Sequence, residues 1–324
     1  MKKAFVAAAV ACTIAAIGPT HAADPYPTRP ITVVVPFAGG SASDVLARVV
    51  LDRMGNTIGQ RFVVDNRPGA GGNIGSQMVA NATPDGYTLL YAGSGPIAVN
   101  KTLTPNLGYD PETDFAPVTL SVVLPNVIVV NPKIPANTLA ELVTYAKAHP
   151  KELYYGSVGI GSSQHLGGVS FEQVTGVQIV HVPYRAASQM STDLISGETQ
   201  LGFQLLPNVL AGIRGGQIKA LAVTGDKRLP ALPDVPTVAE SGIENYRAGS
   251  WFALLAPKGT PPEIVARLQK EHDAAMADPE LRARYVELGA EPVALAPAEA
   301  AKFISNEIAT WREIIRKGGI TIGQ

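Results

Sequence analysis

One stretch near the start of the chain restricts the fold more than any other, because it joins a short apolar segment to a glycine turn and a helix start. Residues 31–35 are a β-branched run that is typical of a buried parallel strand. Pro36 ends the run, the glycines at 39–40 allow a tight turn, and Ser41 or Ser43 can cap a helix. Such a turn leaves backbone N–H groups unpaired at the carboxyl end of a strand, where α/β proteins bind ligands. The stretch therefore predicts either an anion site or a plain β–α connection.

Residues 1–22 have the pattern of a cleaved secretory signal. Lys2 and Lys3 precede an apolar run at 5–17, and a cleavage site of small residues ends at Ala22. The apolar run is shorter than the roughly 20 residues that a membrane-spanning helix needs. We therefore expect cleavage after Ala22 and export of the remaining chain.

Cys12, the only cysteine, lies inside this signal segment. A lipoprotein processing site at Cys12 is an alternative, although the residues before it match such a site poorly. Cleavage after Ala22 leaves a chain without cysteine, which excludes disulfides, thiolate metal sites and a cysteine nucleophile.

The composition fits an exported α/β protein of two lobes. The formal net charge is −1 with 16% charged residues, so no basic surface for nucleic acid or an anionic membrane is expected. Aromatic residues make up 6%, too few for a stacking surface. About 300 residues remain after cleavage, which exceeds one ordinary domain of ~100–200 residues.

Strand and helix patterns alternate along the chain, which indicates a parallel sheet. After the first strand and helix, strands or extended chain are expected at 61–65, 87–91, 115–130 (two apolar runs broken at Pro125), 153–157, 177–182, 200–204, 219–224 and 251–256. Helices are expected at 73–82, 139–148, 163–171, 187–195, 209–213, 262–276, 279–288 and 297–317. The segment 158–165 repeats the opening pattern of strand, glycine turn and hydroxyl cap. Two such turns predict two lobes, each presenting a helix N-terminus.

No catalytic site, metal site or cofactor site is predicted. The chain has no Gly-x-Ser-x-Gly elbow, and Ser163 and His165 are two residues apart, on different faces of a helix. The histidines lack metal-ligand spacing, and neither a dinucleotide fingerprint nor a phosphate loop is present. The function that remains is the binding of a small solute. Two helix N-termini that face each other across a cleft provide partial positive charge and N–H donors, which suit a carboxylate. Arg185 can pair with a second carboxylate or form a structural salt bridge, and Asp44 is interpreted as a capping group.

Eight motifs together resemble one family, and they cover essentially the whole chain after the signal. They are the segments 26–48, 65–75, 84–90, 155–166, 181–185, 219–224, 232–237 and 251–261. In this order they resemble the Bug-type receptors, the extracytoplasmic solute-binding proteins of tripartite tricarboxylate transporters.

The resemblance implies a type II periplasmic-binding-protein fold, in which two α/β lobes close on a small carboxylate. Lobe 1 would comprise residues 23–123 plus 247–324, and lobe 2 residues 124–246. The chain would be a monomeric periplasmic receptor, not an enzyme, that delivers its solute to membrane permease subunits. A sensor that presents its ligand to a membrane signalling protein is an alternative, and an exported hydrolase of an ester or amide is a less favoured one.

The resemblance also implies which residues contact the solute. Carried over, they are Phe37, Ala38, Gly39, Gly40, Ser41, Asp44 and Ser94 on lobe 1, and Ser157, Gly161, Ser162, Ser163, His165, Tyr184, Arg185 and Gln204 on lobe 2. Two positions depart from the family, since Gln204 and Val169 stand where acidic residues are common. Without an acid at 204 to pair with an ammonium group, we expect a di- or tricarboxylate or an aromatic acid rather than an amino acid.

Overall fold

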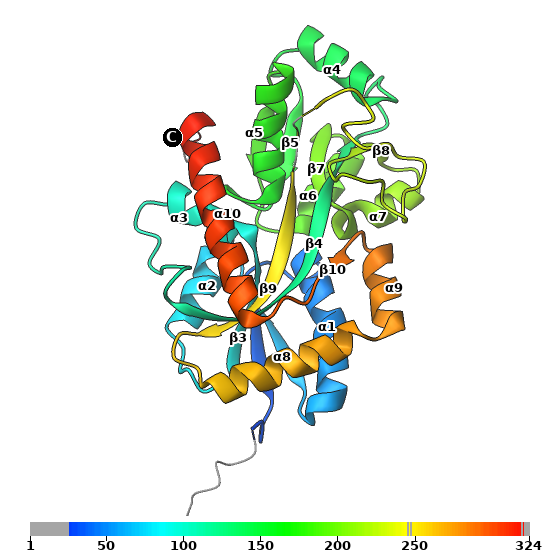
Figure 1. Cartoon of the computed structure of the whole chain (residues 1–324). Coiled ribbons are helices and arrows are strands. Elements are labelled where there is room, and N and C mark those ends of the chain that lie inside the picture. The colour runs from blue at the N-terminus through cyan, green and yellow to red at the C-terminus, as the bar shows by residue number, and fades with distance from the viewer. Residues whose placement is uncertain (1–25, 245, 247, 319, 321–324) are drawn as a thin grey trace, which may run out of the picture.

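The computed structural model describes residues 26–244, 246, 248–318 and 320, and within them ten strands form one curled sheet (Figure 1). The strands are β1 (Ile31–Val35), β2 (Phe62–Asn66), β3 (Thr88–Gly93), β4 (Phe115–Val130), β5 (Tyr154–Ser157), β6 (Val180–Pro183), β7 (Leu201–Leu205), β8 (Lys219–Val223), β9 (Gly249–Pro257) and β10 (Glu291–Pro292). The expected signal segment lies outside the described residues.

Helices cover both faces of this sheet. They are α1 (Ala42–Ile58), α2 (Asn73–Ala80), α3 (Asn100–Leu103), α4 (Leu139–Ala148), α5 (Ser163–Thr175), α6 (Ala187–Ser196), α7 (Leu206–Arg214), α8 (Pro262–Met276), α9 (Pro279–Glu287) and α10 (Pro297–Gly318), with the short turns η1 (Ala70–Gly72) and η2 (Gly95–Val99). Every predicted strand and helix is present, although several ends differ. Among the described helices, none combines the length and the apolar character that crossing a membrane requires.

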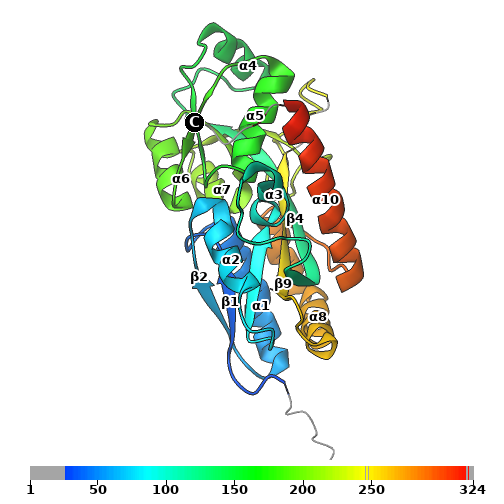
Figure 2. The same cartoon turned by 90° about the vertical axis from the view of Figure 1, so that its left-hand side faces the viewer.

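The sheet has two halves that share β4, in the order β2-β1-β3-β9-β4 and then β4-β7-β5-β6, with β8 and β10 also paired to β4. In the first half β1 pairs in parallel with β2 and β3, while β9 is antiparallel to β3 and β4. In the second half β5 pairs in parallel with β6 and β7. We call the first half with α1–α3 and α8–α10 lobe 1, and the second half with α4–α7 lobe 2. Figures 1 and 2 show β4 and β9 running between the two lobes.

Strand β4 is continuous for 16 residues, whereas the sequence predicted a break at Pro125. Pro125 is the last residue of β4 that pairs with β9, opposite Gly249, and Asn126 is the first that pairs with β7, opposite Leu205. Proline lacks the N–H that a ladder needs, and here it lies where the strand exchanges one partner for another. The boundary that the resemblance implied between lobe 1 and lobe 2, at residues 123/124, falls inside this strand.

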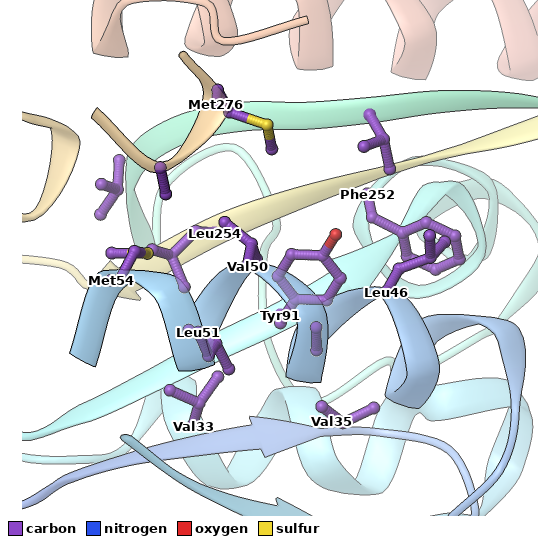
Figure 3. Packing of buried hydrophobic residues seen from close by; sticks show 14 of the residues in the cluster. Val33, Val35, Leu46, Val50, Leu51, Met54, Tyr91, Phe252, Leu254 and Met276 are labelled. Carbon is purple, nitrogen blue, oxygen red and sulfur yellow. The ribbon is translucent and has the colours of Figure 1, made fainter. Parts of the chain in front are cut away.

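The core of lobe 1 fixes the direction of α1 and therefore the place of its first turn. Val33 and Val35 of β1 point toward α1, and Leu51 of α1 lies next to Val33 (Figure 3). Leu46, Val50 and Met54 of α1 belong to the same buried cluster. These side chains are buried, and each contributes roughly 1.5–3 kcal/mol of hydrophobic free energy. Val34, which lies between Val33 and Val35 in the strand, faces the opposite layer, which contains α2 and α10.

The segment 95–103 is helical, and the sequence analysis missed it. It forms η2 and α3, which follow directly on β3. Both elements are too short to show the helical spacing of apolar residues from which a helix is predicted. The segment is nevertheless held in place, because Val99 and Leu103 pack with Ile315 of α10 and with Leu166 of lobe 2.

Candidate functional site

The two predicted glycine turns meet at one small cavity between the lobes, with a volume of about 30 Å³. The first turn leads from β1 into α1 and the second from β5 into α5. Its lining residues are Phe37, Ser41, Ala42, Ser43, Gly93, Gly95, Val158, Ser162, Ser163, Gln164, Leu205, Asn208, Ser250 and Phe252. The expectation that two helix N-termini face one another across a cleft is therefore confirmed.

The start of α1 is capped by Ser41, whose Oγ accepts a hydrogen bond from the Asp44 N–H at 3.4 Å. Asp44 in turn supports the turn before the helix, since Oδ2 accepts from the Gly40 N–H at 2.9 Å. Its Oδ1 accepts from Arg48 and from Asn66, each at 3.0 Å. The interpretation of Asp44 as a capping group agrees with these contacts.

The charge of Asp44 is stable at this position. Burial acts to raise the pKa of Asp44, but hydrogen bonds from Arg48, the Gly40 N–H and Asn66, together with the charge of Arg48, hold that pKa below its ordinary value. The carboxylate therefore remains ionised and supports the glycine turn without lining the cavity itself.

The start of α5 repeats the same cap with different neighbours. Ser162 Oγ accepts from the His165 N–H at 3.4 Å and donates to the Gly159 carbonyl at 2.7 Å. The Gly161 N–H donates to Nδ1 of His165 at 3.3 Å. An imidazole therefore supports this turn in the place that the carboxylate of Asp44 has in the other one.

His165 and His181 pack against each other behind this turn, with ring centroids 4.4 Å apart and ring planes tilted by 45°. Burial lowers the pKa of each to about 4, and for His181 the charge on His165 adds to the effect. Both rings are therefore neutral at pH 7. Nε2 of His181 lies 2.6 Å from Ser157 Oγ, but Ser157 is completely buried and its Oγ also accepts from the Gly159 N–H. The contact holds the turn, and no described carboxylate hydrogen-bonds to His181.

Glycines allow the lobes to approach at the rim of the cavity. A Cβ on Gly71 of lobe 1 would lie 2.7 Å from the Ile160 carbonyl oxygen of lobe 2. A Cβ on Gly161 of lobe 2 would overlap the side-chain oxygen of Asn100 in lobe 1. Asn100 is buried and held by a 2.6 Å hydrogen bond to Asn73, so it cannot move aside easily. The two lobes are thus in direct contact at this rim.

The residues predicted for the site divide into three groups. Those that line the cavity are Phe37, Ser41, Ser162 and Ser163. Those in the two turns or directly beside the cavity, without lining it, are Ala38, Gly39, Gly40, Asp44, Ser94, Ser157, Gly161 and His165. Ser94 Oγ contacts Oγ of Ser250, a lining residue, at 3.1 Å. The third group, Tyr184, Arg185 and Gln204, belongs to lobe 2 and is not among the lining residues of this cavity.

The third group has other structural partners or none. Tyr184 OH donates to Asp193 at 2.7 Å, and burial followed by this contact raises its pKa to about 12. Gln204 is buried, and its amide N–H donates to the Gly156 carbonyl at 3.1 Å. Arg185 is exposed and pairs with no other described residue.

Two lining segments were missed by the sequence analysis, the start of α7 with Leu205 and Asn208 and β9 with Ser250 and Phe252. At the end of β3 the sequence analysis named Ser94, and its two neighbours Gly93 and Gly95 are the lining residues. The start of α7 carries a recognisable helix signal, because Pro207 lies in its first turn. The β9 residues carry no such signal, since only the sheet order brings that strand to the cavity.

The lining supplies hydrogen-bond donors without formal charge. Its polar side chains are the hydroxyls of five serines and the amides of Gln164 and Asn208, and no Lys, Arg, Asp or Glu belongs to it. The starts of α1 and α5 add unpaired N–H groups and partial positive charge. Such an arrangement can hold a carboxylate through hydrogen bonds, and it offers no carboxylate partner to an ammonium group.

The sequence matches a family model described as "Tripartite tricarboxylate transporter family receptor" over residues 46–320. Among curated proteins, it is 37% identical to Protein BugT of Bordetella pertussis over 306 residues, which cover 94% of each chain.

Solved structures give the same picture. The chain resembles the periplasmic binding protein BugD with 36% identity and a TM-score of 0.88, over 91% of this chain and 99% of that one. It resembles R. palustris Rpa4515, solved with adipate, with 39% identity and a TM-score of 0.89, over 91% and 99% of the two chains. MatC from Rhodopseudomonas palustris, solved with malate, follows with 33% identity and a TM-score of 0.84, over 90% and 100%. The expected Bug-type resemblance and the type II binding-protein fold are confirmed.

Proposed function

Because the chain belongs to the tripartite tricarboxylate transporter family of receptors, we propose that it captures a small carboxylate in the periplasm for a membrane permease. The observation that carries this proposal is the meeting of two serine-capped helix starts at one uncharged cavity. Their N–H groups and hydroxyls suit one carboxylate group, and relatives with adipate and malate bound support this ligand class.

Capture would consist of lobe closure without a chemical step. A solute that contacts both helix starts favours the closed form over the open one, because only closure brings the starts together. Lobe 1 would comprise residues 23–123 plus 247–324 and lobe 2 residues 124–246, with export directed by residues 1–22. The protein would act as a monomer that docks on permease subunits.

The solute would be a plain acid rather than an amino acid. No Asp or Glu lines the cavity, so an ammonium group buried there would remain without a counter-charge. Position 204 offers no acid either, because it is a glutamine, and its amide N–H donates to the Gly156 carbonyl. Tight binding of aspartate or glutamate would contradict this choice.

The test is a thermal-shift screen of the protein against adipate, malate, tricarboxylates, aromatic acids and amino acids. A ligand at 100 times its dissociation constant stabilises a protein by about 2.7 kcal/mol, which should raise the Tm by roughly 2 °C or more. A shift with one class of acid would support the proposal, while a shift with none of them would count against it. Turnover of a generic ester such as p-nitrophenyl acetate would favour the hydrolase instead.

Tryptophan emission offers an independent measurement of closure. Trp251 and Trp311 line a crevice of about 750 Å³ on the other side of the crossover strands, formed by segments of both lobes. Ser250 lines both this crevice and the cavity between the helix starts. The chain has two tryptophans in total, so its emission should change when a solute closes the lobes.

A further inference from the structure

Among the described residues that line the cavity, one side-chain hydrogen bond joins the two lobes. Oδ1 of Asn208, in the first turn of α7, accepts from the Ala42 N–H of α1 at 2.9 Å. The two residues are 166 positions apart in the sequence, and both line the cavity. Asn208 therefore contacts the same helix start that would receive the solute.

The N–H of Ala42 is one of the first-turn donors that a helix cannot satisfy internally. The cap of α1 does not reach it, because Ser41 Oγ accepts from Asp44 instead. Among the described residues, its acceptor is the carboxamide of Asn208. Lobe 2 thus supplies the missing acceptor of a lobe 1 helix, and this can happen only when the lobes are closed.

The backbone that carries this carboxamide is held in place by lobe 2. Ser191 Oγ of α6 donates to the backbone carbonyl of Asn208 at 2.9 Å, and Pro207 stiffens the first turn of α7. The helix is anchored by the buried side chains of Leu206 and Val209. The backbone from which the Asn208 side chain extends is therefore positioned by lobe 2.

We propose that Asn208 is a positioning residue which couples lobe closure to the selection of an anionic solute. Its oxygen already accepts from the Ala42 N–H and keeps one further lone pair, whereas its NH₂, a donor only, bonds to no other described residue and is available beside the cavity. A donor favours an acceptor such as a carboxylate and gives nothing to an ammonium group. The coupling to the lobes stands on the hydrogen bond itself, while the selection of an anion rests on the proposed function.

Two variants separate the oxygen from the NH₂ group. Asn208→Ala removes both, whereas Asn208→Asp keeps an acceptor for Ala42 and replaces the donor with a negative charge. An aspartate also suits the first turn of α7, so this variant should fold. Asn81→Ala, an exposed change at the end of α2, is the matched control.

The first measurement is hydrogen exchange of the Ala42 amide, together with small-angle scattering of the ligand-free protein. We expect Asn208→Ala to speed exchange at least fivefold and to increase the radius of gyration, and Asn208→Asp to leave both near the control. If Asn208→Ala exchanges at the control rate, the coupling of the lobes through Asn208 is overturned.

The second measurement is the affinity for adipate by calorimetry. We expect a loss of about fivefold for Asn208→Ala and of more than tenfold for Asn208→Asp, although the aspartate variant stays closed. Equal binding by Asn208→Asp and the control would overturn the role in selecting an anion. Failure of the unchanged protein to bind adipate would count against that ligand, while amide exchange would still decide the role of Asn208 in closure.

Discussion

The starts of α1 and α5 are built from the same sequence pattern, but their surroundings differ. In both, a strand leads to a glycine with positive φ, at 78° for Gly40 and 81° for Gly161, followed by a serine cap. Space is open around Gly40, whereas Gly161 lies against Asn100 of the opposite lobe. Gly40 therefore makes no close contact with the other lobe, although Ala42 two residues later bonds to Asn208, whereas Gly161 itself lies in the contact between the lobes.

The electrostatic support of the two starts differs as well. A carboxylate with a lowered pKa, Asp44, holds the first turn, and a neutral imidazole with a lowered pKa, His165, holds the second. A pattern of glycine, serine and helix thus determines the cap and its N–H groups. It does not determine whether the cap responds to pH or to lobe movement, which depends on the residues packed behind it.

The largest difference between the two turns should follow from adding one methyl group to each glycine. Gly40→Ala should cost about 1–2 kcal/mol of unfolding free energy, from left-handed backbone strain alone. Gly161→Ala adds the overlap with Asn100 and should cost roughly 3 kcal/mol, or else hold the lobes apart and weaken solute binding. Urea denaturation and the affinity for the solute measure both effects. Equal losses in the two variants would show that the lobes do not meet at Gly161 in solution.

Removing the carboxylate behind the first turn should have the next largest effect. Asp44→Ala deletes the acceptor of Gly40, Arg48 and Asn66, and should lower the unfolding free energy by about 2 kcal/mol. The control is Asp52→Ala, at an exposed position of the same helix, which should change it by less than about 0.5 kcal/mol. Similar values for the two variants would contradict a structural role for Asp44.

Acid should weaken the second turn before the first. An unfolded chain protonates its histidines near pH 6.5, whereas His165 and His181 in the folded protein do so only near pH 4. Because the unfolded state then binds more protons, the stability that these groups provide at pH 7 is lost as the pH falls from about 6.5 to 4. The lowered pKa of Asp44 places its own loss below that range. His181→Gln should flatten the dependence of Tm on pH, and an unchanged slope would contradict this account.

The smallest effect should come from the caps themselves. Ser41→Ala and Ser162→Ala each remove an N-cap, which costs about 1 kcal/mol. Ser162→Ala also removes the donor to the Gly159 carbonyl, so it should be the more harmful of the two. Thermal unfolding of both variants measures the two losses of stability. A larger loss for Ser41→Ala than for Ser162→Ala would contradict this prediction.

Much of the framework could be predicted because its causes are local. The strand at 31–35, its glycine turn and the cap at Ser41 involve neighbours within a few residues, so the pattern alone indicates them. The same holds for the turn at Ser162 and for α8, whose predicted ends at Pro262 and Met276 agree with the structure. Resemblance to a family then placed these elements in one known fold.

Tertiary structure alone decided which residues meet at the cavity. Asn208 and Ala42 form their bond only because the two lobes face each other, and Ser250 reaches the cavity because β9 lies between β3 and β4. The amide N–H of Gln204 donates to Gly156 on the neighbouring strand, a contact that only the sheet order creates. Contacts between residues so far apart depend on the order of strands and on lobe closure. A local pattern contains neither of these, so the sequence by itself determined the two helix starts and the closed fold determined what surrounds them.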